Sequence, residues 1–218
     1  MTASIPATTS TVLDWQIHLV DDDAAFRRSL VFLLESMGWA VQAHGSAADY
    51  LTHGLPHIEQ TGCLLLDVRM PGMSGLELQQ ALIARGLYLP IVFLTGHGDV
   101  ELAVQAMKRG AFDFLEKPFK DQRLLDIVSA ALRQREIERA ATDRARQAAE
   151  RLARLSPREA EVARLVARGL PNKLVARALD ISEKTVHIHR QHVMEKAGVG
   201  SAAELARLML QGDPRALD

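Results

Sequence analysis

The first half of the chain alternates between short apolar runs and amphipathic segments. The apolar runs span residues 17–20, 63–66, 91–94 and 114–116. The amphipathic segments span residues 24–37, 75–85 and 100–109, with a short one after Ser46 and another that begins near Asp121. Short apolar runs of this kind are typical of buried strands, and their alternation with helices is typical of a doubly wound parallel sheet. We therefore predict an α/β domain with a doubly wound parallel sheet and helices on both faces.

Polar residues and glycines mark where these helices begin and end. Ser74, followed three positions later by Glu77, predicts a capping box at the start of the third helix. Gly38, Gly86 and Gly110 each fall just beyond a predicted helix, where a glycine commonly ends it.

The middle of the chain reads as one long helix. No Gly or Pro lies between Lys120 and Ser156, and the composition is rich in Ala, Arg and Glu, which favours helix. Small and apolar residues recur at steps of four and three, at Ala141, Ala145, Ala148, Leu152 and Leu155. This spacing fits a short coiled-coil seam in a dimer, but alanine makes a weak seam, so a solvated helical linker stays open as the alternative.

The last third of the chain reads as four helices. Ser156, Pro157 and Glu159 combine an N-cap serine, a proline at the first helical position and a capping glutamate. The first helix ends near Ala167, and the others span residues 173–179, 182–196 and a segment that begins at Ser201. Two of these helices flank a tight turn at residues 180–181, which is the helix-turn-helix arrangement.

Length and charge agree with two domains. Residues 1–120 carry 8 Lys and Arg against 13 Asp and Glu, whereas residues 121–218 carry 18 against 14. The basic second half indicates an anionic partner. We predict an N-terminal tail (1–14), an α/β domain (15–125), a helical linker (126–154), a helix-turn-helix domain (155–212) and a C-terminal tail (213–218).

Targeting and membrane signals do not change this picture. The N-terminus lacks the basic segment and apolar run of a signal peptide, and no apolar stretch approaches the roughly 20 residues of a membrane span. The single cysteine, Cys63, excludes an internal disulfide and reads as a small buried hydrophobe. We expect a cytoplasmic protein.

Polar side chains follow each of the four apolar runs. Asp21 and Asp22 follow the first run, Asp67 the second, Thr95 the third and Lys117 the fourth. The carboxyl ends of parallel strands meet at one edge of a sheet, so these five side chains are predicted to gather there. Clustered carboxylates repel one another unless a cation offsets their charge. Lys117 supplies one cation, and Mg²⁺, which prefers oxygen ligands, is predicted as a second.

Each of these residues has an ordinary explanation when taken alone. A solvated salt bridge would account for Lys117, and a strand-capping role would account for Thr95. Five residues in register after four strands instead favour a site where Asp67 attacks phosphorus as a nucleophile. Asp23 lies one position beyond the acidic pair, and we interpret it as an acid in the first turn of the next helix.

The sequence around these residues resembles the receiver domain of two-component response regulators. The matching motifs are Val-Asp-Asp, Leu-Asp-Val-Arg-Met-Pro, Leu-Thr-Gly and Phe-Leu-Glu-Lys-Pro-Phe, within about residues 16–125, and they look most like the FixJ subgroup. The resemblance implies that Asp22, Asp67 and the backbone carbonyl of Arg69 bind Mg²⁺, with Asp21 acting through water. It also implies a five-stranded parallel sheet, and contacts of Thr95 and Lys117 with phosphoryl oxygens. Phe114 matches the aromatic switch position, for which a buried strand phenylalanine is the alternative, and the bond before Pro118 is a candidate for cis.

The C-terminal segment resembles the LuxR-type output domain of NarL/FixJ regulators. The matching motifs are Leu-Ser-Pro-Arg-Glu, Gly-Leu-Pro-Asn-Lys, Ala-Arg-Ala-Leu-Asp-Ile-Ser and Lys-Thr-Val-His-Ile-His-Arg. In the predicted recognition helix Val186 and Val193 should face the core. The resemblance implies base contacts from His187, Ile188 and Gln191 in the major groove. Contacts to phosphates are expected from Lys173, Ser182, Lys184, Thr185 and Arg190.

Two features limit what this second resemblance implies. The family often carries Lys at the positions of His187 and Gln191, so a preferred DNA sequence does not carry over. His187, His189 and His192 also suggest a metal site, but no Cys or carboxylate completes one, and we do not predict it.

Together these features predict a transcription factor rather than an enzyme, although its receiver would assist its own phosphorylation and dephosphorylation. The expected partners are a sensor histidine kinase, double-stranded promoter DNA and RNA polymerase, with a homodimer forming on phosphorylation. Two other classes of protein stay open. A phosphohydrolase of the dehalogenase type would want an acid two residues after Asp67, where Arg69 stands, and a phosphorelay module would lack the recognition helix.

Overall fold

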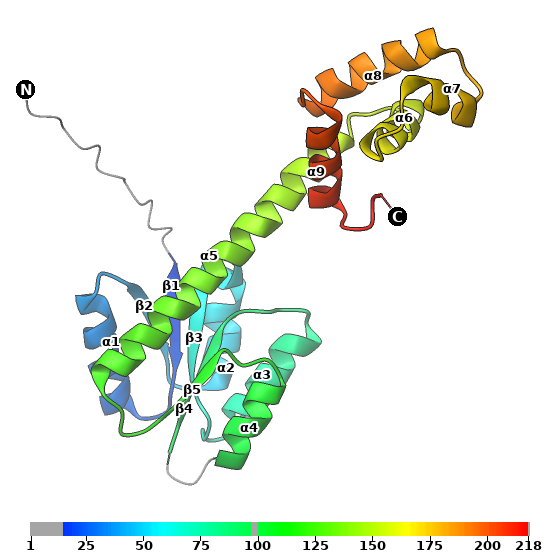
Figure 1. The fold of residues 1–218 in the computed structure, drawn as a ribbon. Coiled ribbons are helices and arrows are strands. Elements are labelled where there is room, and N and C mark those ends of the chain that lie inside the picture. The colour runs from blue at the N-terminus through cyan, green and yellow to red at the C-terminus, as the bar shows by residue number, and fades with distance from the viewer. Residues whose placement is uncertain (1–14, 97–99, 218) are drawn as a thin grey trace, which may run out of the picture. The chain divides into compact units, whose positions relative to one another are not determined.

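A computed structural model describes residues 15–96 and 100–217 of the chain (Figure 1). The chain divides into two compact units, residues 1–137 and 138–218. The tail predicted for residues 1–14 lies outside the described residues. None of the described helices is both long and apolar enough to cross a membrane.

The first unit is built on a five-stranded sheet in which every neighbouring pair is parallel, in the order β2-β1-β3-β4-β5. The predicted fold of this unit is therefore confirmed. Val20 pairs with Leu66, Asp67 with Leu94, and Thr95 with Glu116, so the strand ends lie level along one edge. The strands are β1 (Gln16–Val20), β2 (Ala40–His44), β3 (Thr61–Asp67), β4 (Ile91–Thr95) and β5 (Asp113–Glu116).

Helices flank the sheet and bury its two faces in separate cores. Leu64 and Leu66 of β3 belong to one core, and Leu65 belongs to the other, because successive strand residues point to opposite faces. The first core includes residues of α3 (Gly75–Ala84) and α4 (Val100–Lys108). The second includes residues of α1 (Ala24–Ser36) and α5 (Asp121–Leu152).

The segment after Ser46 is less regular than predicted. Ser46 caps α2 (Ala47–Asp49), but a π-helical turn (Tyr50–Gly54) and a 3₁₀ segment (Leu55–Gln60) continue directly from it. Tyr50 is fully buried among the residues of the first core, so its packing determines the course of the backbone in this segment.

The predicted helix ends are confirmed, and Asp23 needs a correction. Gly38, Gly86 and Gly110 have positive φ, and Ser74 forms the expected capping box with Glu77. Asp23 lies outside the first turn of α1 and is its N-cap, because its carboxylate accepts hydrogen bonds from the amides of Ala25 (2.8 Å) and Phe26 (3.1 Å).

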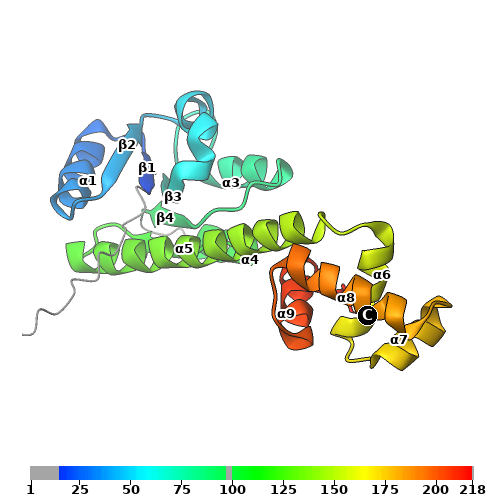
Figure 2. The same cartoon turned by 90° about the horizontal axis from the view of Figure 1, so that it is seen from above.

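The second unit contains four helices beyond α5: α6 (Pro157–Ala167), α7 (Asn172–Leu179), α8 (Glu183–Ala197) and α9 (Ala202–Gly212). Ser156 and Glu159 form the predicted capping box, and Ser182 and Ser201 cap α8 and α9. Asp180 adopts a left-handed conformation with φ of 51°, which makes the tight turn between α7 and α8. In Figure 2, α8 and α9 lie beside the C-terminal end of α5.

Helix α5, which includes the predicted linker at residues 126–154, contributes residues to the core of each unit. Leu124, Ile127, Val128 and Ala131 are buried in the first unit. Ala148 is buried in the second unit, where Leu152 and Leu155 pack against the same core. Three positions of the possible coiled-coil seam, Ala148, Leu152 and Leu155, thus contact the core of their own chain. Ala216 and Leu217 also pack against the second core, so the predicted C-terminal tail is partly anchored.

Candidate functional site

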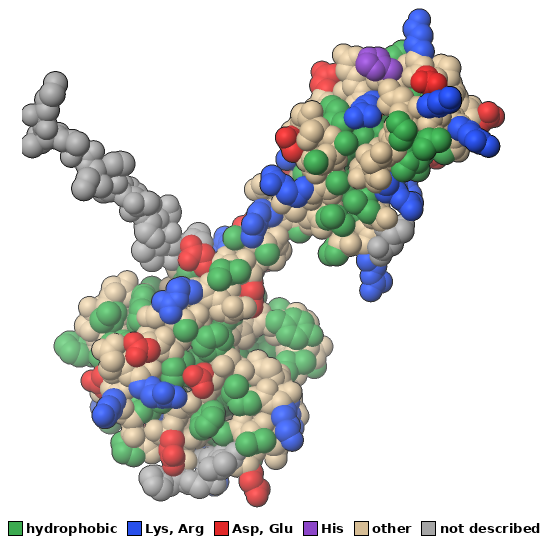
Figure 3. Space-filling model, viewed as in Figure 1, with side chains coloured by type: hydrophobic (Ala, Val, Ile, Leu, Met, Phe, Trp, Pro, Cys, Tyr) green, Lys and Arg blue, Asp and Glu red, His purple; other side chains and the backbone are tan. Residues whose placement is uncertain are grey.

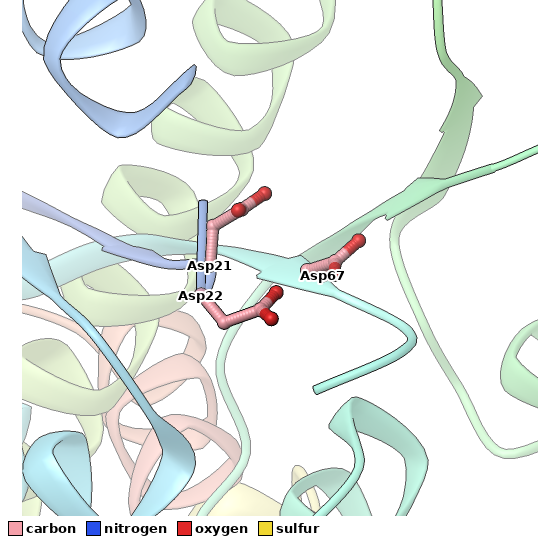
Figure 4. Close-up of side chains that lie close together, drawn as sticks. All are labelled: Asp21, Asp22 and Asp67. Atoms are coloured by element: carbon pink, nitrogen blue, oxygen red, sulfur yellow. The ribbon is translucent and has the colours of Figure 1, made fainter. Parts of the chain in front are cut away.

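Three carboxylates meet at the carboxyl edge of the sheet. Asp67 is the last residue of β3, and Asp21 and Asp22 follow β1 (Figure 4). One oxygen from each lies within 4.8 Å of the others, and this is the one such metal-ligating group within residues 15–96 and 100–217. Asp21 and Asp67 are buried, whereas Asp22 is exposed. The structure therefore brings these predicted residues together.

Lys117 closes the cluster from the end of β5. Its Nζ donates hydrogen bonds to Asp21 Oδ2 at 2.7 Å and to Asp67 Oδ1 at 3.1 Å. Its backbone amide donates to the carbonyl of Thr95 at 2.7 Å, which ties β5 to the end of β4. The Lys117–Pro118 bond is cis, as predicted.

The electrostatic balance of the site depends on Lys117. Burial raises the pKa of Asp67, the neighbouring Lys117 ammonium lowers it, and the charges of Asp21 and Asp22 raise it again. For Lys117, burial alone would lower the pKa, but its hydrogen bond to Asp21 and the charge of Asp67 outweigh burial and raise it. The ammonium thus stays charged and offsets only part of the negative charge. Three carboxylate oxygens with excess negative charge suit a hard divalent cation.

Thr95 and Phe114 occupy neighbouring strands beside this cluster. Thr95 is the last residue of β4 and is buried. Phe114 lies on β5 and is 39% exposed, so the alternative of a fully buried strand phenylalanine is wrong. Arg69 lies in the loop between β3 and α3, two residues beyond Asp67, with an exposed side chain.

A close backbone contact holds the end of β3 against the start of α3. The Gly75 amide donates to the carbonyl of Val68 at 3.0 Å. A Cβ atom at Gly75 would lie 2.2 Å from the backbone oxygen of Asp67. Glycine is therefore required here by close approach of the two backbones.

In the second unit, α8 divides into a buried and an exposed face as predicted. Val186 and Val193 are fully buried. His187, Ile188 and Gln191 are exposed, and Ile188 keeps 45% of its surface accessible although it is apolar. An exposed Ile between polar neighbours is suited to contact an apolar group such as a thymine methyl.

The residues predicted to contact phosphates differ in their exposure to solvent and in their hydrogen bonds within the chain. Lys173, Ser182 and Lys184 are exposed, whereas Thr185 and Arg190 are half-buried. The Ser182 hydroxyl accepts from the Thr185 amide at 3.0 Å, and Arg190 donates to Asn172 at 3.2 Å. Figure 3 shows further Lys and Arg side chains exposed on the visible face of this unit.

An ion pair that the sequence analysis missed fixes α8 to α6. Glu159 is buried, and the Lys196 ammonium donates to both its oxygens at 2.9 and 2.7 Å. These hydrogen bonds and that from the Ser156 amide hold the pKa of Glu159 at about 2. Arg151 donates to the carbonyl of Ala197, at the same C-terminal end of α8. The C-terminal end of α8 is thus anchored to α6 and to α5 within the second unit.

The first unit also contains a buried pair of histidines that the sequence analysis missed. Nδ1 of His18 lies 2.9 Å from Nε2 of His44, and the Tyr50 ring packs edge-on against both. Burial, with a smaller contribution from the neighbouring His44, lowers the pKa of His18 to about 4. No local signal marked the pair, because His18 lies within an apolar run.

Comparisons with known proteins agree with both units. A model of the response regulator receiver domain matches residues 17–129, and a model of bacterial regulatory proteins of the luxR family matches residues 153–209. The chain is 47% identical over 194 residues to the transcriptional regulatory protein FixJ of Azorhizobium caulinodans, covering 89% of this chain and 91% of that protein. It is 48% identical over 199 residues to the C4-dicarboxylate transport transcriptional regulatory protein DctR of Rhodobacter capsulatus, covering 90% of this chain and all of that protein.

Solved structures show the same organisation. The response regulator StyR matches with a TM-score of 0.80 and 44% identity over 88% of this chain and 96% of that one. Full-length FixJ from B. japonicum matches with a TM-score of 0.58 and 46% identity over 91% and 97% of the two chains. The chain therefore belongs to the two-component response regulators with a LuxR-type output domain, and it is a phosphorylation-dependent DNA-binding regulator of transcription.

Proposed function

We propose that Asp67 is the residue that accepts the phosphoryl group, from a sensor histidine kinase. The observation that carries this proposal is the contact of Asp67 with Lys117 at 3.1 Å beside the two carboxylates that follow β1. Asp21 also accepts a hydrogen bond from Lys117, but Asp67 is the carboxylate that ends the central strand, and Asp22 is exposed.

Residues of this chain would then divide the work of phosphoryl transfer. An oxygen of Asp67 forms the new bond to phosphorus while the bond to the leaving group breaks. Lys117 would donate to one phosphoryl oxygen, and Thr95 would donate to another as it turns toward the phosphate. Phe114, which is already partly exposed, would follow Thr95 as the switch residue. The receiver would thereby assist both its own phosphorylation and its dephosphorylation.

Asp21, Asp22 and Asp67 fit Mg²⁺, because all three donors are carboxylates and their oxygens lie close together. We propose that Asp22, Asp67 and the backbone carbonyl of Arg69 ligate the ion directly and that Asp21 reaches it through water. Mg²⁺ would screen the charge between the nucleophile and the anionic phosphoryl group.

The exposed face of α8 is proposed to read promoter DNA. Gln191 could pair bidentately with an adenine, Ile188 could contact a thymine methyl, and His187 could donate to a base acceptor. Lys173, Lys184 and Arg190 would contact phosphates, together with Ser182 and Thr185 at the helix N-terminus. Phosphorylation would favour a homodimer, which places two such helices on DNA where RNA polymerase can be recruited.

We propose the domain limits 15–125 for the receiver and 155–212 for the helix-turn-helix domain, with a helical linker at 126–154, and a cytoplasmic location. Ile127, Val128 and Ala131 of this linker pack in the core of the receiver. Ala148 of the linker packs in the core of the output domain.

The test of the acceptor is labelling by radioactive acetyl phosphate with Mg²⁺. Asp67→Asn should fold normally and lose the label, because an amide cannot serve as the nucleophile. Asp126→Asn, which changes an exposed carboxylate of α5, is the matched control and should label like the wild type. Persistent labelling of Asp67→Asn would contradict the assignment.

A further inference from the structure

Phe26 places an aromatic face against the ammonium of Lys117. Its ring centroid lies 4.2 Å from Lys117 Nζ, well within the range of a cation–π interaction. Phe26 is half-buried in the first turn of α1, just beyond the Asp21–Asp22 pair. Nothing in the sequence analysis assigned it a role.

A second ring fixes the orientation of the first. Phe119 contacts Phe26 edge-to-face, with centroids 6.0 Å apart and an interplanar angle of 73°. Phe119 lies two residues beyond Lys117, so the same short segment supplies both the ammonium and the ring that braces Phe26. Both phenylalanines pack against the core shared with α5, which restrains their motion.

The Phe26 ring attracts the Lys117 ammonium without adding negative charge to the site, as a further carboxylate would. Two carboxylates already accept hydrogen bonds from Lys117, at 2.7 and 3.1 Å. A further carboxylate would raise the pKa of Asp67 and repel the incoming phosphoryl group. The face of an aromatic ring attracts a cation through its quadrupole and adds no net charge.

Phosphoryl transfer changes the contact between Lys117 and Asp67 but leaves the contact between Lys117 and Phe26 unchanged. When an Asp67 oxygen bonds to phosphorus and the leaving group departs with its electron pair, that oxygen no longer offers a full negative charge to Lys117. The ring face is unchanged by this step. It therefore keeps attracting the ammonium while the partner of Lys117 changes from a carboxylate to a phosphoryl oxygen.

We propose that Phe26 is a positioning residue for phosphorylation: its ring face, braced by Phe119, holds the Lys117 ammonium where it meets the phosphoryl group at Asp67. This inference rests on the proposed role of Asp67 as the acceptor. It predicts that the rate of phosphorylation depends on the electron density of the ring at position 26 and not only on its shape.

The experiment replaces Phe26 in the full chain with mono-, di- and trifluorophenylalanine and measures the rate constant for labelling by acetyl phosphate with Mg²⁺. Fluorine withdraws electron density from the ring face with little change in size, so the logarithm of the rate should fall in even steps along the series. Phe26→Leu should be slower by about three- to thirtyfold, and Phe26→Tyr should stay within about twofold of the wild type.

The matched control is the same series at Phe32, which lies on the same helix and is 78% exposed. It should label at the wild-type rate throughout, because acetyl phosphate needs no kinase surface. Equal rates along the Phe26 series, or Phe26→Leu at the wild-type rate, would overturn the inference while leaving Asp67 as the acceptor. Absence of labelling in the wild type, or labelling that survives Asp67→Asn, would overturn the acceptor assignment and this inference with it.

Discussion

Replacement of Gly75 by alanine tests whether the backbone contact between β3 and α3 holds the acceptor in place. The added Cβ would lie 2.2 Å from the Asp67 carbonyl oxygen and 3.0 Å from Leu66 Cγ. Ordinary contacts begin near 3.4 Å, so the Asp67 contact is too short by about 1.2 Å. Because the obstructing atom belongs to the backbone, no side-chain rotation relieves it.

Gly75→Ala is expected to destabilise the receiver, whereas an unhindered glycine-to-alanine substitution in a helix stabilises it. At an open helical position, alanine in place of glycine stabilises by about 0.5–1 kcal/mol. At Gly75 the two backbones must separate, which strains the hydrogen bond from the Gly75 amide to Val68. Overpacking of this kind costs about 1–3 kcal/mol, and the loss of one hydrogen bond adds about 1 kcal/mol. We expect Gly75→Ala to lower the free energy of unfolding by about 2–4 kcal/mol.

Urea unfolding followed by tryptophan fluorescence measures this change in the receiver, because both tryptophans, Trp15 and Trp39, lie in the first unit. Gly45→Ala is the matched control, since its Cβ would lie 3.6 Å from the nearest atom, in the Arg27 side chain. Labelling by acetyl phosphate should also slow in Gly75→Ala, because the displaced backbone carries Asp67. If Gly75→Ala is as stable as Gly45→Ala and labels at the wild-type rate, the close approach does not position the acceptor.

Three further predictions concern the switch, the buried histidines and DNA. Lys117→Ala and Thr95→Ala should still accept some phosphate but lose phosphate-dependent dimerisation, measured by light scattering; a normal dimer in both variants would count against the switch. Because the pKa of native His18 is about 4 against an ordinary 6.5, the unfolded chain binds a proton that the native chain does not. The free energy of unfolding should therefore fall by about 2–3 kcal/mol as the pH drops from about 6.5 to 4, and His18→Gln should flatten this dependence in urea titrations; an equal slope in both proteins would refute it. Gln191→Ala should cost about 1–3 kcal/mol at the cognate DNA site with a changed preference at one base pair, whereas Lys184→Ala should weaken binding to all sequences and reduce its salt dependence; uniform loss in Gln191→Ala across single-base operator variants would show that Gln191 does not read a base.

The residues at the carboxyl edge of the sheet could be predicted from two facts: which polar residue follows each apolar run, and the parallel pairing of the strands. Each apolar run ends in a polar residue, and parallel pairing then brings Asp21, Asp67, Thr95 and Lys117 level. The four output helices were also predicted, since Ser156, Ser182 and Ser201 mark where they begin.

The parts that escaped prediction depend on contacts between residues far apart in the chain. Phe26 meets Lys117 across 91 positions, and no periodicity in either segment indicates that contact. His18 meets His44 between two neighbouring strands. The spacing of Ala148, Leu152 and Leu155 marked one face of α5, but such spacing is the same whether the face packs on a second chain or on the core of its own chain.

The burial of the chain's single cysteine has a practical consequence. Cys63 lies on central strand β3 and is fully buried, and burial raises the pKa of its thiol to about 12. Thiol reagents attack the thiolate, so modification must wait until the sheet opens. The rate of thiol modification in the native protein therefore reports the opening of the receiver without any added probe. Because the chain has no other cysteine, one introduced at the surface could be labelled selectively for spectroscopy.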